Sequence, residues 1–549
     1  MQDERNGYTE KITQSTASYK VIVAGAGTGK SFTMLKLLEA DTNKNYLVLT
    51  LTNELINALD ADLGEHASCW TLHKLILDIY KTDLQGAKTV YPQFPDVLKK
   101  DEKILGLGIN LMNGVQTAKD SNHEDVKAYF NRSDYYNAIC FDGMTYLVWQ
   151  YFAKELDKIR VYDLVLIDEF QDFNKLEVEL VNVLEARNKL VIVGDDDQSI
   201  YSFRGANPQY LREKYRSGKY INFTLPFCCR CTQVIVDAVN TIVEKANVKE
   251  RIAKEYRCYL PEKKEDSIAY KKIMHKHFTV QGRQQTTNYM GKFISHFYKN
   301  RIESSEKENA RRQKKTLILI IGPRHYLDQV YPLLVEEVEE ENISYRKSKQ
   351  AKKLIVALKL IKADRNSNLG WRLIAEEKLS SSEFNALIKQ SMSDNFLEII
   401  PSELEKTVTN VLILLDQKEY HQKAVQEFLK LHEISQIEML WDTQDQNKLF
   451  EDDEYSQIKL ATFEGSKGLA ADYVFITGLQ EGVLPKTNNA TEAEICKFIV
   501  ALTRTRKQCH IFTCGRFSGT LQKKSFFLNW ISEYLFYEKI DKSKINDYQ

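Results

Sequence analysis

Long apolar runs are missing from this sequence. The densest run, Leu317 to Ile321, has the length of a strand, whereas a membrane-spanning helix needs about 20 apolar residues. Residues 1 to 10 are polar and lack the apolar core of a secretory signal. We therefore expect a soluble, cytoplasmic protein with no membrane partner.

A paired set of cysteines is also missing, because the sequence has nine, an odd number. In a large soluble chain we expect reduced and mostly buried thiols. The cluster Cys228, Cys229 and Cys231, with Cys258 later, leaves a metal site as the alternative. Zinc ligands are usually spaced Cys-x2–4-Cys, so adjacent cysteines fit such a site poorly.

Net charge is absent as well, since 76 basic residues balance 76 acidic ones. Any contact with nucleic acid must then come from a locally basic groove. The apolar fraction of 43% and the charged fraction of 28% are typical of globular proteins. At about 100–200 residues per domain, 549 residues predict three or four domains.

Short β-branched runs, each followed by a helical pattern, predict doubly wound parallel α/β sheets. One set comprises Val21–Val23, Leu47–Thr50, Leu164–Ile167 and Leu190–Val193. A second set comprises Phe223–Leu225, Leu317–Ile321, Ile458–Ala461, Tyr473–Ile476 and His510–Thr513. We predict a first core from residues 1–80 and 141–222, and a second from 223–365 and 449–549. The stretches 81–140 and 366–448 lack strand patterns and are predicted to be helical insertions.

The strongest local motif follows the first predicted strand. Its residues are Ala24, Gly25, Ala26, Gly27, Thr28, Gly29, Lys30, Ser31 and Phe32. The glycines let backbone N–H groups point inward at phosphate oxygens, and the helix that begins near Lys30 adds its positive dipole end. Lys30 is placed for the β- and γ-phosphates of a nucleotide and Ser31 for Mg²⁺. The motif predicts a nucleotide-binding loop with ATP and Mg²⁺ as cofactors.

Two later strands also end in polar residues at the edge where α/β sheets bind ligands. After Leu164–Ile167, Asp168 is expected to hold Mg²⁺ and Glu169 to polarise the attacking water. After Leu190–Val193, Gln198 is placed to sense the γ-phosphate. Three residues follow that suit stacking on unpaired bases: Tyr201, Phe203 and Arg204. The alternative for Phe203 is an ordinary core position.

The ordered set of motifs resembles the UvrD/Rep/PcrA group of superfamily 1 DNA helicases. Leu225 to Thr232 looks like the fourth motif of that family, with Arg230 as its arginine. Leu460 to Leu469 looks like the fifth, and Phe498 to Arg506 like the sixth, with Arg504 as its arginine. The resemblance runs from about residue 20 to residue 515. It implies two RecA-like cores of the P-loop NTPase class.

The resemblance also implies a mechanism. ATP would be hydrolysed between the cores, with Arg230 and Arg504 as arginine fingers, and each cycle would move single-stranded DNA in the 3′-to-5′ direction. Thr52, Asn53 and His73 match the family's strand-contacting residues in the first core. We expect a DNA helicase or translocase in repair, recombination or phage defence, with a repair protein or a nuclease as a possible partner.

Departures from the family concern the base of the nucleotide. Cys229 replaces the tyrosine that stacks on adenine, and Phe32 replaces an arginine. No glutamine stands at the usual distance before the phosphate loop, since Gln14 is too close and Gln2 too far. We therefore predict that Phe32 packs against the base, with packing against its own sheet as the alternative.

Thinner stacking on DNA leaves a second hypothesis from another class. The third motif has Phe203 where tryptophan is usual, and Leu51 replaces a phenylalanine before Thr52. The alternative is a DNA-stimulated ATPase subunit that controls a partner nuclease without processive unwinding. We expect no fused nuclease, because the stretch after residue 515 is too short for a further domain of that kind.

Overall fold

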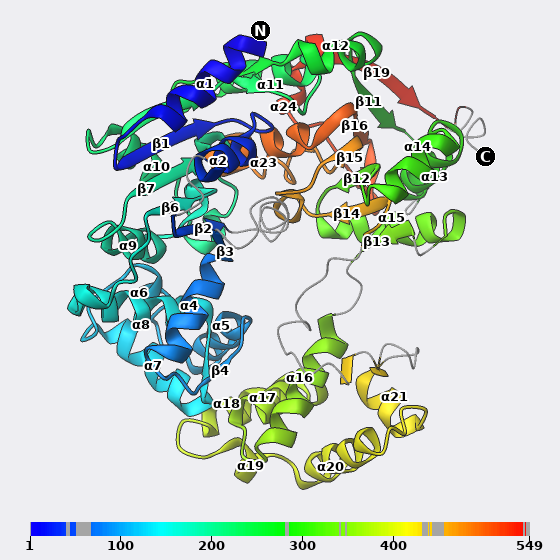
Figure 1. Cartoon of the computed structure of the whole chain (residues 1–549). Helices are drawn as coiled ribbons and strands as arrows, with labels where there is room; N and C mark the ends of the chain where they lie inside the picture. Colours follow the sequence, from blue (N-terminus) through cyan, green and yellow to red (C-terminus); the bar gives the residue numbers. More distant parts are fainter. Residues whose placement is uncertain are drawn as a thin grey trace. The chain divides into compact units, whose positions relative to one another are not determined.

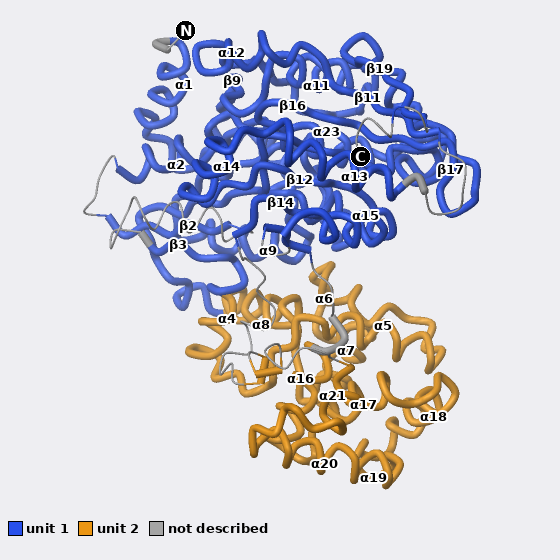
Figure 2. Tube along the Cα trace, turned by 90° about the vertical axis from the view of Figure 1, so that its right-hand side faces the viewer, with its two compact units in different colours: residues 1–75, 155–345, 454–549 blue, residues 76–154, 346–453 orange. Residues whose placement is uncertain are grey.

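The computed structural model describes residues 2–39, 44–50, 67–279, 285–339, 342–345, 349–430, 437–438, 440–441, 455–541 and 544. The chain divides into two compact units, coloured separately in Figure 2. The first unit, formed by residues 1–75, 155–345 and 454–549, carries two large parallel sheets. The second unit, formed by residues 76–154 and 346–453, is mainly helical. This α/β architecture confirms the predicted fold class.

The first sheet has six parallel strands in the order β3-β2-β6-β7-β1-β8 (Figure 1). The strands are β1 Tyr19–Ala24, β2 Tyr46–Thr50, β3 Ala67–Thr71, β6 Leu164–Ile167, β7 Leu190–Gly194 and β8 Ile221–Leu225. Every residue of β2 and β7 is buried, which accounts for their unbroken apolar runs. Helices α1 (Gln2–Gln14) and α2 (Lys30–Glu39) contribute Ile12 and Met34 to the core on one face.

Strand β8 corrects one prediction. Phe223–Leu225 was assigned to the second set of strands, but β8 pairs with β1 in the first sheet, with Ala24 opposite Leu225. Periodicity identifies a strand without identifying its partner, so the assignment depended on position in the chain alone. Here α10 (Gln209–Arg216) returns the chain to the free side of β1, and the first sheet therefore ends after residue 225.

The second sheet has seven parallel strands in the order β13-β14-β12-β15-β16-β11-β19. They are β11 Ile273–Phe278, β12 Ile318–Ile321, β13 Ile343–Ser344, β14 Ile458–Ala461, β15 Ala471–Thr477, β16 Thr505–Cys514 and β19 Leu535–Ile540. Alternate residues face two hydrophobic clusters: Ile321 lies with α11 (Gln233–Ala246) and α23 (Glu492–Thr503), and Ile320 with α13 (Gln285–Asn300) and α15 (Arg324–Glu337). Helices therefore cover both faces, as a doubly wound sheet requires.

The helical unit is built from segments far apart in the sequence. Its helices include α5 Phe94–Leu105, α6 Asn113–Gln116, α7 Glu124–Tyr136, α8 Phe141–Lys154, α16 Lys349–Ala363, α17 Asn368–Lys378, α18 Ser381–Gln390, α19 Phe396–Ile399, α20 Ser402–Asp416 and α21 Lys423–Leu429. Asp101 is fully buried and pairs with Arg132 (2.6 Å) and with Arg372 (3.0 Å). Both stretches predicted to be insertions thus meet in one unit, which also takes in α8 and α16, placed in the cores by the sequence.

Among the residues described, no helix combines the length and the apolar character needed to span a bilayer.

Candidate nucleotide and nucleic-acid site

The phosphate loop joins β1 to α2 at the carboxyl edge of the first sheet. Gly27 and Gly29 have φ values of 69° and 88°, which side chains with a Cβ rarely adopt. At Gly27 a Cβ would lie 2.5 Å from Cβ of Arg230, so the absence of a side chain also permits this close approach. The backbone N–H of Cys229 donates to the carbonyl of Gly27 (2.8 Å), which fixes the next segment on the loop.

Lys30 and Glu169 form the central ion pair of the site, with Nζ 2.9 Å from Oε1. Glu169 follows β6 with a left-handed backbone (φ 53°), which turns its side chain back toward the loop. Burial opposes its charge, but Lys30, Lys467 and the hydrogen bonds from Lys30 and Gln171 hold the pKa of Glu169 below its usual value. Glu169 is therefore ionised, as a group that orients a water nucleophile must be.

Asp168 and Ser31 have the chemistry of a magnesium site. Burial, together with the neighbouring charge of Glu169, raises the pKa of Asp168 to about 7. Its Oδ1 is buried without a hydrogen-bond partner, a costly state that a cation would relieve. Ser31 stands in the first turn of α2 with its side chain exposed. Because Mg²⁺ prefers oxygen ligands, these two residues fit the ion and would hold it beside the phosphates.

Arg504 links the second sheet to this site. It caps α23, is 3% exposed, and donates from Nη2 to Oε1 of Gln198 (3.1 Å), which follows β7 of the first sheet. Burial and the nearby Arg230 lower the pKa of Arg504 to about 10, so the guanidinium stays charged at neutral pH. Arg230 lies beside it, with Nη1 3.5 Å from the carbonyl of Thr503.

Lys467 is a site residue that the sequence reasoning did not single out. It lies within the fifth motif, and its Nζ contacts Oδ2 of Asp172 and, at 3.5 Å, Oε2 of Glu169. It also donates to the carbonyl of Gln198 (2.9 Å). Burial opposes its charge, but Asp172 and Glu169 outweigh burial and raise the pKa of Lys467. A second fixed cation from the second sheet thus reaches the carboxylates of the first.

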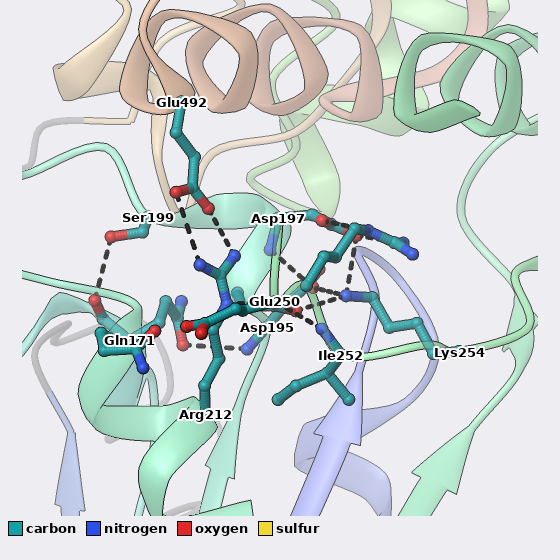
Figure 3. Close-up of polar contacts among 12 residues, drawn as sticks. Gln171, Asp195, Asp197, Ser199, Arg212, Glu250, Ile252, Lys254 and Glu492 are labelled. Carbon is teal, nitrogen blue, oxygen red and sulfur yellow. Dashed lines mark hydrogen bonds and ion pairs between the residues drawn. The ribbon is translucent and has the colours of Figure 1, made fainter. Parts of the chain in front are cut away.

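The acidic run Asp195–Asp197 after β7 is occupied by cations of the chain itself (Figure 3). Lys254 Nζ lies 2.8, 2.8 and 2.7 Å from the three carboxylates. Arg212, on α10, pairs with Asp196 (3.0 Å) and reaches Glu492 at the start of α23. These ion pairs neutralise the acidic run and join the two sheets at their interface.

A cavity of about 350 Å³ opens on the phosphate loop. Its lining includes Lys30 together with Arg230, Lys263 and Arg506, three cations that follow β8 in the chain. Four basic side chains around one cavity match the charge of a triphosphate, and the volume suits a small-molecule ligand.

The residues predicted to contact DNA lie in part within the described structure. Phe203 is 69% exposed, which contradicts an ordinary core position, and its ring centroid is 6.0 Å from that of Tyr201. Arg204 is exposed, while burial and the charge of Arg204 lower the pKa of His73 to about 3, so His73 is neutral. These four residues gather on the first sheet domain, but Thr52 and Asn53 fall outside the described residues.

Comparison with known proteins agrees with this arrangement. The profile of the UvrD/REP helicase N-terminal domain matches residues 109–219. A probable DNA helicase II homolog of Mycoplasma genitalium is 23% identical over 94% of this chain and 86% of that protein. The ATP-dependent DNA helicase PcrA of Staphylococcus epidermidis is 23% identical over 92% of this chain and 83% of its own length. By these matches the chain is similar to the UvrD/Rep/PcrA DNA helicases.

Another relative, a probable DNA helicase II homolog of Mycoplasma capricolum, is 25% identical over 78% of this chain. That match spans 66% of the relative, just under two thirds of its length. As a UvrD/Rep/PcrA-like protein, the chain is an enzyme of the ATP-dependent DNA helicase class.

In this UvrD/Rep/PcrA-like protein, one sequence signal could have identified Lys467: the residue lies within the fifth motif, Leu460 to Leu469. No comparable signal marked Lys254 or Arg212. Lys254 lies 58 residues from its partner Asp196, and Arg212 lies 280 residues from its partner Glu492. Such pairs become visible only when the sheets are assembled.

Proposed function

We propose that this helicase hydrolyses ATP between its two sheet domains and uses each cycle to move 3′ to 5′ along single-stranded DNA. The main support for this proposal is the cavity of about 350 Å³ at the phosphate loop, which is lined by both Lys30 and Arg230. Because Arg230 follows β8 and packs by Thr503 of the second domain, closing and opening of the domains would alter the cavity directly.

The ion pair Lys30–Glu169 supports an order of events within the site. Lys30 Nζ lies 2.9 Å from Oε1 of Glu169. An entering β/γ-phosphate competes for Lys30, because a phosphate offers several charged oxygens. Glu169 is then freed to accept a proton from the attacking water. Mg²⁺, held by Ser31 and Asp168, would neutralise charge on the phosphates.

Arg504 and Arg230 would act on the charge that develops at the transferred phosphoryl group. Fixed guanidinium groups in a buried site stabilise such charge without reorganisation. Loss of the γ-phosphate would remove what these arginines bind, and the two domains would separate. Repeated closure would draw the strand past Phe203 and Tyr201, whose rings offer stacking surfaces for bases.

The proposed direction follows the family resemblance, and the proposed setting is DNA repair, recombination or phage defence. The test measures ATP turnover of the full chain with and without single-stranded DNA, and strand displacement on duplexes with a 3′ or a 5′ tail. We expect stimulation by single strands and displacement only from the 3′ tail. The variant Lys30→Ala should be inactive, whereas Lys36→Ala, an exposed lysine of α2 paired with Glu39, should match the parent.

If neither DNA nor RNA stimulated ATP turnover, the proposed motor function would be contradicted. Displacement from the 5′ tail would contradict the direction alone. Stimulated turnover without any movement on DNA would instead favour a DNA-stimulated ATPase that acts through a partner.

A further inference from the structure

A small pocket adjoins the phosphate loop at Thr28 and Gly29. Its walls include Arg5 and Tyr8 of α1, Phe32 of α2 and Phe227 after β8, and Gly29 lines both this pocket and the larger cavity. The pocket has about 10 Å³ of free interior volume, room for no more than one water. A nucleotide whose phosphates lie on Gly29 and Lys30 would place its base at this wall, because the base is joined to those phosphates through one ribose.

Arg5 occupies the centre of this wall. Its guanidinium carbon lies 5.6 Å from the ring centroid of Phe32 and 5.0 Å from that of Tyr259. Arg5 Nη1 is 3.0 Å from Oε1 of Glu262, and that carboxylate is half exposed. Within the described part of the chain, the contacts of the Arg5 guanidinium are two ring faces and one half-exposed carboxylate, which leave it able to turn toward a ligand.

Cys229 replaces an aromatic ring beside the same wall and leaves stacking to Phe32. Burial raises the pKa of the Cys229 thiol to about 12, so the group carries no charge. Phe32 is 41% exposed, which contradicts simple packing of its ring inside the sheet. The charged groups at this wall include the guanidinium of Arg5 and the carboxylate of its partner Glu262.

We propose that Arg5 and Glu262 read the edge of the base, and that GTP is used at least as well as ATP. This inference rests on the proposed function, since it concerns the nucleotide of that same site. The guanidinium supplies donors only, and the carboxylate acceptors only. The pair therefore prefers a base that presents adjacent acceptors together with adjacent donors.

Guanine meets that requirement better than adenine. Its O6 and N7 accept from an arginine fork, the commonest specific contact of arginine with a base. Its N1–H and N2–H groups can both donate to one carboxylate. Guanine would thus form two hydrogen bonds with the guanidinium and two with the carboxylate. Adenine offers N6–H donors and single acceptors at N1 and N7, a pattern matched by an amide side chain. Pyrimidines present a shorter edge and reach fewer of these groups.

The competing explanation is that the Arg5–Glu262 pair merely ties α1 to α12 (Leu260–Ala269). An exposed ion pair of that kind contributes little to stability. Under this explanation replacement of Arg5 would change ATP and GTP use equally. Base recognition instead predicts a change in their ratio.

The experiment compares kcat/KM for GTP and ATP with single-stranded DNA, and the affinities for GDP and ADP by calorimetry, in the parent and in Arg5→Gln. We expect the parent to use GTP at least as well as ATP. Arg5→Gln should shift the GTP-to-ATP ratio toward ATP by about tenfold or more, because an amide suits adenine. Arg312→Gln is the matched control, since Arg312 is exposed on α14 (Ser304–Arg312) and pairs with Glu308 of the same helix.

A parent that strongly prefers ATP, or an Arg5→Gln variant with an unchanged ratio in both measurements, would overturn the inference. Those results would not contradict the proposed function, because ATP would still be bound and hydrolysed. Absence of binding and turnover with every nucleotide would instead overturn the proposed function and the inference with it. Glu262→Gln gives a second arm, with an expected loss of GDP affinity greater than that of ADP affinity.

Discussion

Arg504 of the second sheet domain is connected to Glu169 of the first by an unbroken series of hydrogen bonds. Arg504 donates to Gln198 (3.1 Å), and Gln198 Nε2 donates to Asp195 Oδ2 (2.6 Å). The backbone N–H of Asp195 donates to Oε1 of Gln171 (2.9 Å), whose Nε2 donates to Oε2 of Glu169 (2.5 Å). The proposed arginine finger and the proposed catalytic base are thereby connected across the domain interface.

Glu169→Gln should still bind ATP but should hydrolyse it about 10²–10⁴ times more slowly, because an amide cannot accept the proton of the attacking water. Single-turnover kinetics and equilibrium ATP binding measure the two properties separately. Glu179→Gln, on the surface of α9 (Lys175–Leu184), is the control. Hydrolysis by Glu169→Gln at the parental rate would show that another group activates the water.

Arg504→Ala should lower kcat by about 10³-fold or more while ATP affinity changes little, because the guanidinium acts on charge that develops only in the transition state. Steady-state kinetics with saturating DNA give kcat and KM. The control is Arg216→Lys, at an exposed position of α10. A variant whose KM rises while kcat is retained would assign Arg504 to ground-state binding instead.

Gln171→Met should break the hydrogen-bond series between Arg504 and Glu169. It should leave no cavity, since methionine has about the volume of this fully buried side chain. Two hydrogen bonds of the series are lost, one of them to a charged group, and such a bond contributes about 1.5–3 kcal/mol. We expect kcat to fall at least tenfold with unchanged ATP affinity. Equal kcat values for variant and parent would mean that the series has no role in catalysis.

Phe203→Ala should weaken binding of single-stranded DNA by about 1–3 kcal/mol, the contribution of one stacked base. Fluorescence anisotropy with a labelled oligonucleotide measures the affinity, and ATP turnover without DNA should stay at the parental level. Phe536→Ala removes another exposed ring (53%), from the edge strand β19, and serves as control. Similar losses in both variants would argue against a specific contact at Phe203.

Asp101→Asn should destabilise the helical unit by about 3–5 kcal/mol, because buried Arg132 and Arg372 would lose their shared counter-charge. Hydrogen exchange in peptides from residues 76–154 and 349–430 reports on this unit separately from the sheets. Asp416→Asn removes an exposed pair with Lys362 and should cost less than about 1 kcal/mol. Unchanged protection in Asp101→Asn would mean that apolar packing alone joins the two segments.

The sequence by itself determined the elements whose causes are local. The apolar runs at β1, β6 and β7 predicted buried parallel strands, and glycines with positive φ at positions 27 and 29 predicted the phosphate loop. The order of motifs predicted the family. These features depend on residues adjacent in the chain, so their physical reasons can be read from spacing and side-chain type.

Only the tertiary structure decided which distant groups meet. The edge position of β8 beside β1, the ion pair Asp101–Arg372 and the approach of Lys467 to Asp172 join residues separated by long stretches of chain. Pairing energy between strands and between charges depends on distance in space, which no local pattern encodes. For the same reason the sequence showed the lack of a glutamine before the phosphate loop, while the structure shows Arg5 at the pocket beside that loop.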